Sequence, residues 1–294
     1  MIAVMLNPSS GLTRRPRLRE EVDELFRNAG VDARIHELAD PQAIPQESRR
    51  VLAERPEAIV AGGGDGTVSA VASVLAGTAT PLGVLPLGSL NHFAKDAGIP
   101  LDLHKAVETV AARHVRRVDV GRVNDRIFIN NSSIGVYPSV VESRERLRSR
   151  GRSKWAALVL ATVDVLQSES EMTIRLEDDR ARVLTRTPFV FVGNNEYLAE
   201  GLRLGARTRL DAGRLWTYFA PPVKTRHLPR LFAHALFGFA RREHALESTA
   251  GTEFWIDTAA SAINVASDGE LLTLATPLHF RSWPGALALF VPAS

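Results

Sequence analysis

The chain has 294 residues, 45% of them hydrophobic and 23% charged, and its formal net charge at pH 7 is +3. These values are typical of a soluble globular protein long enough for two domains of roughly 150 residues each, and the small net charge gives no reason to expect a nucleic-acid partner. The sequence has no cysteine, which excludes disulfides, cysteine-ligated zinc and thiol catalysis and fits a reducing cytoplasm.

No segment of the sequence predicts export or membrane insertion. Residues 1–6 are too short and too uncharged for a secretory signal, and Asn7-Pro8 ends this run. No apolar run approaches the ~20 residues that a membrane-spanning helix needs. We therefore expect a cytoplasmic protein.

The first 120 residues alternate strand-like and helix-like segments. A helix with apolar positions Leu18, Val22 and Phe26 follows the first strand. Such alternation predicts a parallel sheet with helices on its faces, so we expect an N-terminal α/β domain of residues 1–120. The four strand-like runs are residues 2–6, 31–38, 58–61 and 81–85.

A glycine-rich loop, GGGDGT at residues 62–67, joins the third strand to a helix marked by Val68, Val71 and Leu75. Glycine allows positive φ and a close approach of ligand to the backbone, and a helix N-terminus favours bound phosphate. Asp65 would repel phosphate by itself, so we expect it to hold a cation or to transfer a proton. The alternative interpretation is a tight turn with a solvated aspartate.

Three polar loops follow strands of the predicted sheet, at residues 7–11, 62–67 and 88–91. Ligands of parallel sheets bind beyond the carboxyl ends of the strands, so these loops predict one phosphate-binding site. Asp65 can hold Mg²⁺ there, because magnesium prefers carboxylate and phosphate oxygens. The sequence contains no Walker-type loop and no protein-kinase motif, which argues against both of those nucleotide-binding classes.

From about Val118 the pattern changes to short strands with few crossover helices. The segments 172–176 and 182–185 alternate around a charged turn, which predicts a hairpin. We therefore expect an antiparallel, sandwich-like second domain of residues 121–279. Further strand-like runs are residues 189–192, 215–219 and 254–256.

Two segments interrupt this β pattern. The first, ESRERLRSRGRSK at residues 142–154, has six basic and two acidic residues, and an apolar helix-like run at 155–166 follows it. The second, residues 227–248, carries an apolar helical stripe flanked by arginines. One interpretation is a core stripe with a solvated face, and the other is a basic surface that meets anionic lipid headgroups.

Four motifs of the chain together resemble the diacylglycerol kinase catalytic family, which includes bacterial lipid kinases and sphingosine kinases. The glycine loop alone is less specific, since NAD kinases and phosphofructokinases have a similar one. The resemblance covers nearly the whole chain and matches in order and spacing. The motifs are Asn7-Pro8-x-Ser10-Gly11, Gly63-Gly64-Asp65-Gly66-Thr67, Pro86-Leu87-Gly88-Ser89-x-Asn91 and Asp268-Gly269-Glu270.

This resemblance implies a nucleotide-binding α/β domain, a C-terminal antiparallel β-sandwich and an active site in the cleft between them. It also implies that residues 280–294 return to the first domain. The implied reaction is transfer of the γ-phosphoryl group of ATP, with Mg²⁺, to a lipid hydroxyl, most simply from diacylglycerol to phosphatidic acid in phospholipid biosynthesis. The implied partner is a lipid substrate. From the basic segments we also expect an anionic membrane surface as a partner, at which the protein would be peripheral.

The resemblance also assigns roles to residues. Glu270 matches the general base, Asp65 is catalytic and binds metal, and Asp268 helps to bind metal or nucleotide. On the local pattern alone, Asp-Gly between two apolar runs is a hairpin turn. The nucleotide-binding set is Asn7, Ser10, Gly63, Gly64, Asp65, Gly66, Thr67, Ser89, Asn91 and Asp268.

The sequence departs from the family pattern at three positions. His92 stands where an aspartate is commoner, and Ser89 replaces the more frequent threonine but keeps the hydroxyl. Asp211 matches a structural metal ligand of some bacterial members, but Ala212 stands where a second aspartate is usual.

Two alternative functions stay open at this point. One is an NAD-kinase-like enzyme with a soluble hydroxyl substrate, and the other is a non-catalytic regulator that binds nucleotide or lipid. The oligomeric state is open too, with a homodimer among the alternatives.

Overall fold

The structure, a computed structural model, describes residues 1–11, 16–135, 172–177, 182–187, 189–198, 206–219, 247–258 and 260–293. The basic segment 142–154 and the apolar run 155–166 lie outside these residues. Of the amphipathic segment 227–248 only the last two residues are described, and they begin strand β12 (Glu247–Gly251).

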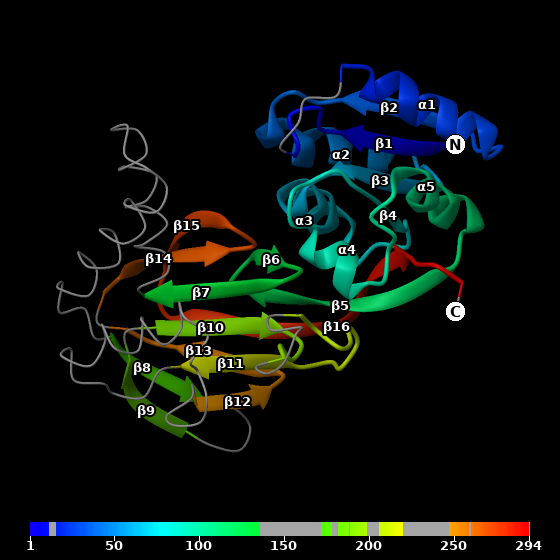
Figure 1. The fold of residues 1–294 in the computed structure, drawn as a ribbon. Helices are drawn as coiled ribbons and strands as arrows, with labels where there is room; N and C mark the ends of the chain where they lie inside the picture. Colours follow the sequence, from blue (N-terminus) through cyan, green and yellow to red (C-terminus); the bar gives the residue numbers. More distant parts are fainter. Residues whose placement is uncertain are drawn as a thin grey trace, which may run out of the picture.

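The first sheet begins with four parallel strands in the order β2-β1-β3-β4, as the alternating pattern predicts. Figure 1 shows them beneath and between the helices of the N-terminal half. These strands are β1 (Ile2–Leu6), β2 (Ala33–Glu37), β3 (Ala58–Gly63) and β4 (Leu82–Pro86). The helices are α1 (Leu18–Asn28), η1 (Pro41–Ala43), α2 (Ile44–Ala53), α3 (Asp65–Leu75), α4 (His92–Asp96) and α5 (Leu103–Ala112).

Helices cover both faces of this sheet. Successive residues of β1 point to opposite faces, so Ala3 and Met5 pack in the core under α2 and α3, while Ile2 and Val4 pack in the core under α1 and α5. Both cores are apolar, and both exclude water from the strands. The sheet is therefore a rigid base for the loops at its carboxyl edge.

Beyond β4 the same sheet becomes mixed. Strand β16 (Leu278–Phe290) pairs in parallel with β4 through Leu289 and Leu82, and it pairs antiparallel with β5 (Val115–Val123). The short strand β6 (Arg126–Phe128) continues the order, and β13 (Glu253–Ile256) pairs with the first half of β16.

A second sheet of six antiparallel strands forms the C-terminal half, in the order β12-β11-β10-β7-β14-β15. The predicted hairpin is confirmed as a separate two-stranded sheet of β8 (Met172–Glu177) and β9 (Arg182–Thr187). Besides β12, the six-stranded sheet contains β7 (Asn131–Gly135), β10 (Phe189–Asn194), β11 (Leu215–Phe219), β14 (Ala262–Ser267) and β15 (Glu270–Ala275).

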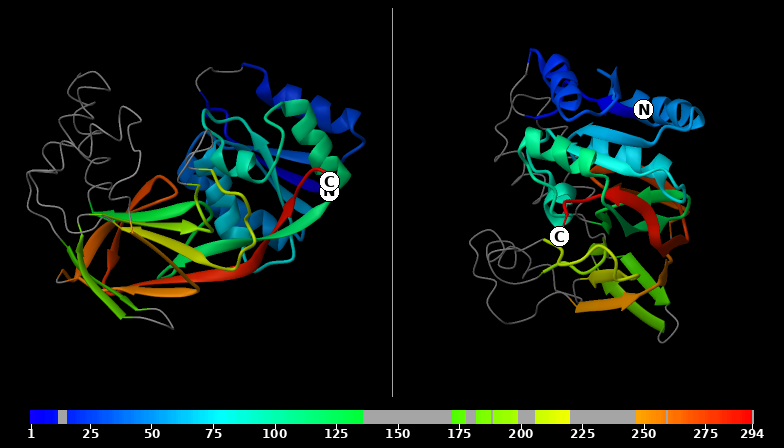
Figure 2. Two further views of the ribbon diagram at one scale, coloured as in Figure 1. Left: turned by 60° about the horizontal axis from the view of Figure 1, so that its bottom comes forward. Right: turned by 90° about the vertical axis from the view of Figure 1, so that its right-hand side faces the viewer.

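The six-stranded sheet packs against the far end of the first sheet, and this is the predicted sandwich. Its core combines residues of β7, β10, β11 and β14 with residues of β5, β6, β13 and β16, among them Phe128, Val192, Phe254 and Phe280. Figure 2 shows β5 (green) and β16 (red) as long strands that run from the sandwich into the α/β half. Two strands are thus common to both halves.

Candidate active site

The structure brings the three polar loops together at the carboxyl ends of β1, β3 and β4. The side chain of Asn7 donates from Nδ2 to Thr67 Oγ1 at 3.3 Å, and Ser10 Oγ accepts from the Gly64 amide at 3.3 Å. The third loop lies against the second, since a Cβ atom at Gly88 would be 2.5 Å from the Cα atom of Gly64. The loops predicted to bind phosphate therefore form one surface.

Close packing explains two of the glycines. A Cβ atom at Gly63 would lie 2.3 Å from Thr67 Oγ1, and at Gly88 the nearest atom is backbone, so neither position has space for a side chain. The first amides of an α-helix have no partner inside the helix. The amides at the start of α3, in residues 65–67, are consequently available to phosphate oxygens.

Asp65 is the first residue of α3 and is half-buried. Its Oδ1 accepts from the amide of Phe93 at 3.1 Å, near the start of α4. Among the described residues no hydrogen-bond donor contacts Oδ2. One carboxylate oxygen therefore anchors the start of α4, directly after the third loop, and the other suits a hard cation such as Mg²⁺ together with phosphate oxygens.

Asn91 shapes the third loop with its own side chain. It has left-handed backbone (φ 51°), and its Nδ2 donates to the carbonyls of Pro86 and Gly88, while Oδ1 accepts from the Gly88 amide at 3.0 Å. The side chain is buried. The neighbouring Ser89 and His92 are exposed at the rim of the same loop.

Asp268 and Gly269 form the turn between β14 and β15, as the Asp-Gly pattern predicts. Both have positive φ, 47° and 88°, and the flanking Ser267 and Glu270 pair with each other. The Asp268 carboxylate accepts four hydrogen bonds, from Ser69 Oγ at 2.6 Å and from the amides at 129–131 at 2.8 to 3.2 Å. Burial raises the pKa of Asp268, and these donors oppose that rise by favouring the charged form.

Glu270 begins β15 directly after this turn and is exposed. Side chains alternate along a strand, so Glu270 shares its face with Leu274, which packs against the sandwich core. That face of the sheet is turned toward the first sheet. No other described residue forms a hydrogen bond or an ion pair with the Glu270 carboxylate, which is therefore available to a ligand.

A buried ion pair at the end of α4 was not predicted from the sequence. Arg207 donates from Nε to Asp96 Oδ2 at 2.7 Å, with 0% and 7% of the two side chains exposed. Its other nitrogens donate to the carbonyls of Ile129 and Asn194 and to Asn130 Oδ1. The partners are 111 residues apart, so no local pattern could have indicated the pair.

Asp211, the predicted structural metal ligand, forms an ion pair with Arg209 at 2.9 Å on the surface. The part of the chain that the structure describes contains no group of three or more acidic or histidine side chains that could hold a metal. The segment around Asp211 is held instead by the buried Asp119, which accepts from the amides of Gly213 and Gly285 at 2.6 and 2.8 Å. A metal at Asp211 stays a prediction.

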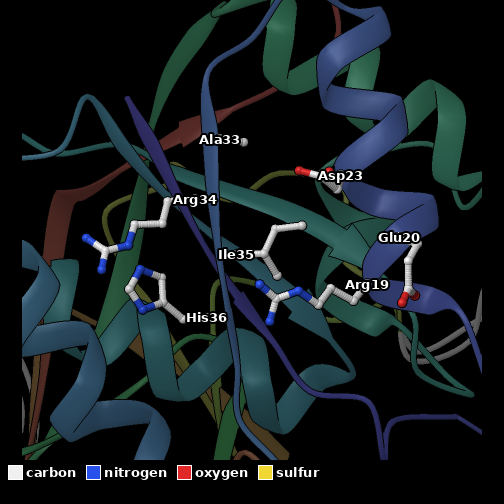
Figure 3. A pocket seen from close by; sticks show the side chains of 7 residues that line it. All are labelled: Arg19, Glu20, Asp23, Ala33, Arg34, Ile35 and His36. Atoms are coloured by element: carbon white, nitrogen blue, oxygen red, sulfur yellow. The ribbon is translucent and has the colours of Figure 1, made fainter.

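An open cavity of about 480 Å³ lies elsewhere, around the edge strand β2 and the adjacent α1. Figure 3 shows Arg34 and His36 on one side of the strand and Arg19, Glu20 and Asp23 on the other. Its lining includes none of the residues of the four motifs. The cavity is therefore separate from the candidate active site.

Two family models match the chain. Residues 1–123 match the diacylglycerol kinase catalytic domain, and residues 132–291 match the YegS C-terminal NAD kinase beta sandwich-like domain. The two matches meet between β5 and β7, close to the change of pattern in the sequence.

Similar proteins include a "Probable lipid kinase YegS" of Salmonella arizonae, 28% identical over 286 residues that cover 94% of this chain and 91% of the relative. A diacylglycerol kinase of Staphylococcus carnosus is 27% identical over 213 residues, 71% of this chain and 69% of the relative. A crystal structure of a diacylglycerol kinase from Bacillus anthracis has a TM-score of 0.70 at 18% identity, and it covers 99% of this chain and 96% of that chain. This last likeness concerns the fold.

Proposed function

Because the chain belongs to the family that joins a diacylglycerol kinase catalytic domain to a YegS-type C-terminal sandwich, we propose that it is an ATP-dependent lipid kinase. It transfers the γ-phosphoryl group to a lipid hydroxyl, most simply that of diacylglycerol, which yields phosphatidic acid. One observation supports this more than any other. Helix α3, which begins at Asp65, is joined to the turn that precedes Glu270 by the 2.6 Å hydrogen bond from Ser69 to Asp268.

Phosphoryl transfer depends on positioning and on neutralisation of charge. The amides at the start of α3 bind the phosphates, and the ordered Asn7–Thr67 and Ser10–Gly64 contacts keep the loops in place for them. The Asp65 oxygen that has no donor among the described residues would hold Mg²⁺, and the metal would offset charge on the phosphates.

Glu270 acts on the lipid hydroxyl as the general base. Its carboxylate accepts the hydroxyl proton while the hydroxyl oxygen forms a bond to the γ-phosphorus, and the bond from that phosphorus to the leaving ADP oxygen breaks. The exposed position of Glu270 supports this role, because a bound acceptor can reach its carboxylate without displacing a protein partner.

We further propose that the enzyme works at the cytoplasmic surface of an anionic membrane. Its substrate is a lipid, and the segment 142–154 has a local net charge of +4, with six basic residues against Glu142 and Glu145. This segment lies outside the described residues, so the proposal depends on the sequence. Within the described part of the chain, no helix is long and apolar enough to span a bilayer.

Phosphorylation of a soluble hydroxyl substrate is the second candidate function, because the family model that matches residues 132–291 is named for a NAD kinase-like sandwich.

The test supplies labelled ATP and Mg²⁺ with diacylglycerol in anionic vesicles, with vesicles alone, or with NAD. We expect label in phosphatidic acid, and none when Asp65→Asn replaces the parent. Label in NADP would support the second candidate, and nucleotide binding without any labelled product would support a non-catalytic regulator.

A further inference from the structure

One hydrogen bond joins the helix after the glycine loop to the turn before Glu270. Ser69 of α3 donates from Oγ to Oδ2 of Asp268 at 2.6 Å, across 199 residues of sequence. It is the shortest of the four hydrogen bonds that this carboxylate accepts. The resemblance to lipid kinases assigns no role to Ser69.

The Asp268 carboxylate has no capacity left for a nucleotide or a metal. Oδ1 accepts from the amides of Asn130 and Asn131 at 2.9 and 3.2 Å, and Oδ2 accepts from Ser69 and from the amide of Ile129 at 2.8 Å. A carboxylate offers about four acceptor sites, two on each oxygen, and all of them are filled by protein donors. Asp268 is thus an anchor for its turn.

The position of Glu270 follows from that anchor. Asp268 is the first residue of a two-residue turn, and Glu270 is paired with Ser267 immediately after it, so the short turn leaves little freedom between the two carboxylates. On the other side of the bond, Ser69 lies four residues after Asp65 in α3. Residues at i and i+4 share one face of a helix.

We propose that Ser69 is a positioning residue, which acts through Asp268 to hold Glu270 at a fixed place relative to the glycine loop and Asp65. The inference rests on the proposed function and deepens it. Ser69 itself touches neither substrate nor nucleotide. Its hydroxyl supplies the one hydrogen bond that the Asp268 carboxylate receives from the α/β half, while the other three come from residues 129–131.

Loss of the Ser69 hydroxyl does not threaten the fold. The two halves stay joined by β5 and β16 and by the buried Asp96–Arg207 pair. Asp268 also keeps its three amide donors. We therefore expect the substitution to make the position of Glu270 less fixed and to leave both halves folded.

The test compares Ser69→Ala with Ser69→Thr, which keeps the hydroxyl, and with Ser73→Ala on the same helix. Ser73 is the matched control, because its Oγ donates to the Ala70 carbonyl within α3 at 2.7 Å. We expect Ser69→Ala to lower kcat by about tenfold with KM for ATP within about twofold, since small displacements of a catalytic group cost rate. Ser69→Thr and Ser73→Ala should keep the parent kcat.

A double-mutant cycle separates positioning from a general structural effect. If Ser69 acts through Glu270, adding Ser69→Ala to Glu270→Gln lowers kcat by less than about twofold more. Independent, multiplicative losses would overturn the proposal, as would an unchanged kcat for Ser69→Ala in an active parent. A parent that phosphorylates no acceptor would instead overturn the proposed function, and the positioning role with it.

Discussion

The three acidic residues of the candidate site differ in how many hydrogen bonds their carboxylates accept from the protein. Asp65 uses one oxygen to hold the Phe93 amide, Asp268 uses both oxygens on protein donors, and Glu270 uses neither. The number of free acceptor sites therefore differs along the series. This number distinguishes the proposed metal ligand, the anchor and the proposed base, which the residue type alone does not.

Replacing Asp65 with asparagine should nearly abolish turnover and preserve the fold. The asparagine side-chain oxygen can still accept from Phe93, but the charge that we propose holds Mg²⁺ near the phosphates is lost. Initial rates over a range of Mg²⁺ concentrations, with circular dichroism as the control for folding, check this. Near-normal turnover at saturating ATP would contradict the role of Asp65.

Replacing Glu270 with glutamine should lower kcat by about 10²–10⁴-fold, the usual cost of losing a general base. The affinity for ATP and the melting temperature should stay close to those of the parent, because Glu270 is exposed. Steady-state rates and calorimetric ATP titrations measure both quantities. An equal fall in affinity and rate would place Glu270 in the nucleotide site instead.

The sequence indicated which motifs make up the candidate site, but it did not indicate the hydrogen bonds and ion pairs that join them to distant parts of the chain. Asp65, Thr67 and the Asp-Gly turn lie in short motifs, and local chemistry is sufficient to find them. The partners of Asp268 and Asp96 are 199 and 111 residues away in sequence, at Ser69 and Arg207. Such pairs depend on how the two halves pack, and no spacing in the chain encodes them.

At the scale of elements, the short helix α4 is fixed at both ends. Asp65 accepts from the Phe93 amide at its start, and Asp96 at its end pairs with the buried Arg207 beside β7 and β10. Five residues alone would be a marginal helix. These tertiary contacts therefore account for its stability, and they also explain why the pattern around His92 did not indicate a helix.

Asp96→Ala should lower the free energy of unfolding by about 3–5 kcal/mol, because it leaves the Arg207 charge buried and unpaired. The matched control is Asp211→Ala. This substitution breaks the exposed pair with Arg209 and should cost no more than about 1 kcal/mol. Urea unfolding of both variants measures the difference, and equal losses would contradict the buried character of the Asp96 pair.

Helix α2 gives a prediction about pH. The hydrogen bond from Arg50, aided by His36, lowers the pKa of Glu47 from 4.5 to about 2. A carboxylate whose pKa is lowered by folding stabilises the folded state at any pH above its pKa in the unfolded chain. This contribution is lost as the pH falls through its pKa in the folded state. The unfolding free energies of parent and Glu47→Gln should differ at pH 7 and converge between about pH 4.5 and pH 2. A difference that is constant over this range would contradict the ion pair.

Most strands were predicted correctly because their apolar runs are local signals, as for β1, β3 and β11. Strand β16 was expected only as a returning tail. It contains Pro284 and Gly285, which weaken any strand pattern, and its register with β5 shifts between Trp283 and Leu287. Its extended form depends on β5 and β4, which lie more than 150 residues earlier in the chain.

At the scale of the whole molecule, the prediction concerns the membrane. Changing Arg146, Arg148 and Arg150 to serine should weaken binding to anionic vesicles by about 100-fold at low salt, because each basic residue contributes about 1 kcal/mol at such a surface. The parent should also lose binding as salt rises, since charges are screened within roughly 10 Å at 0.1 M salt. Co-sedimentation with anionic and with zwitterionic vesicles measures both. Equal binding of variant and parent at low salt would make this segment an ordinary solvated surface.

The place of β16 in the first sheet has a consequence for biosynthesis. The strand lies between β4 and β5, although it is translated after every other strand that the structure describes. Until it emerges from the ribosome, β4 and β5 of the nascent chain each have a strand edge with unpaired backbone groups. The first sheet therefore cannot be completed before residues 278–290 have been translated, and a chain that stops before them would lack the strand that joins β4 to β5.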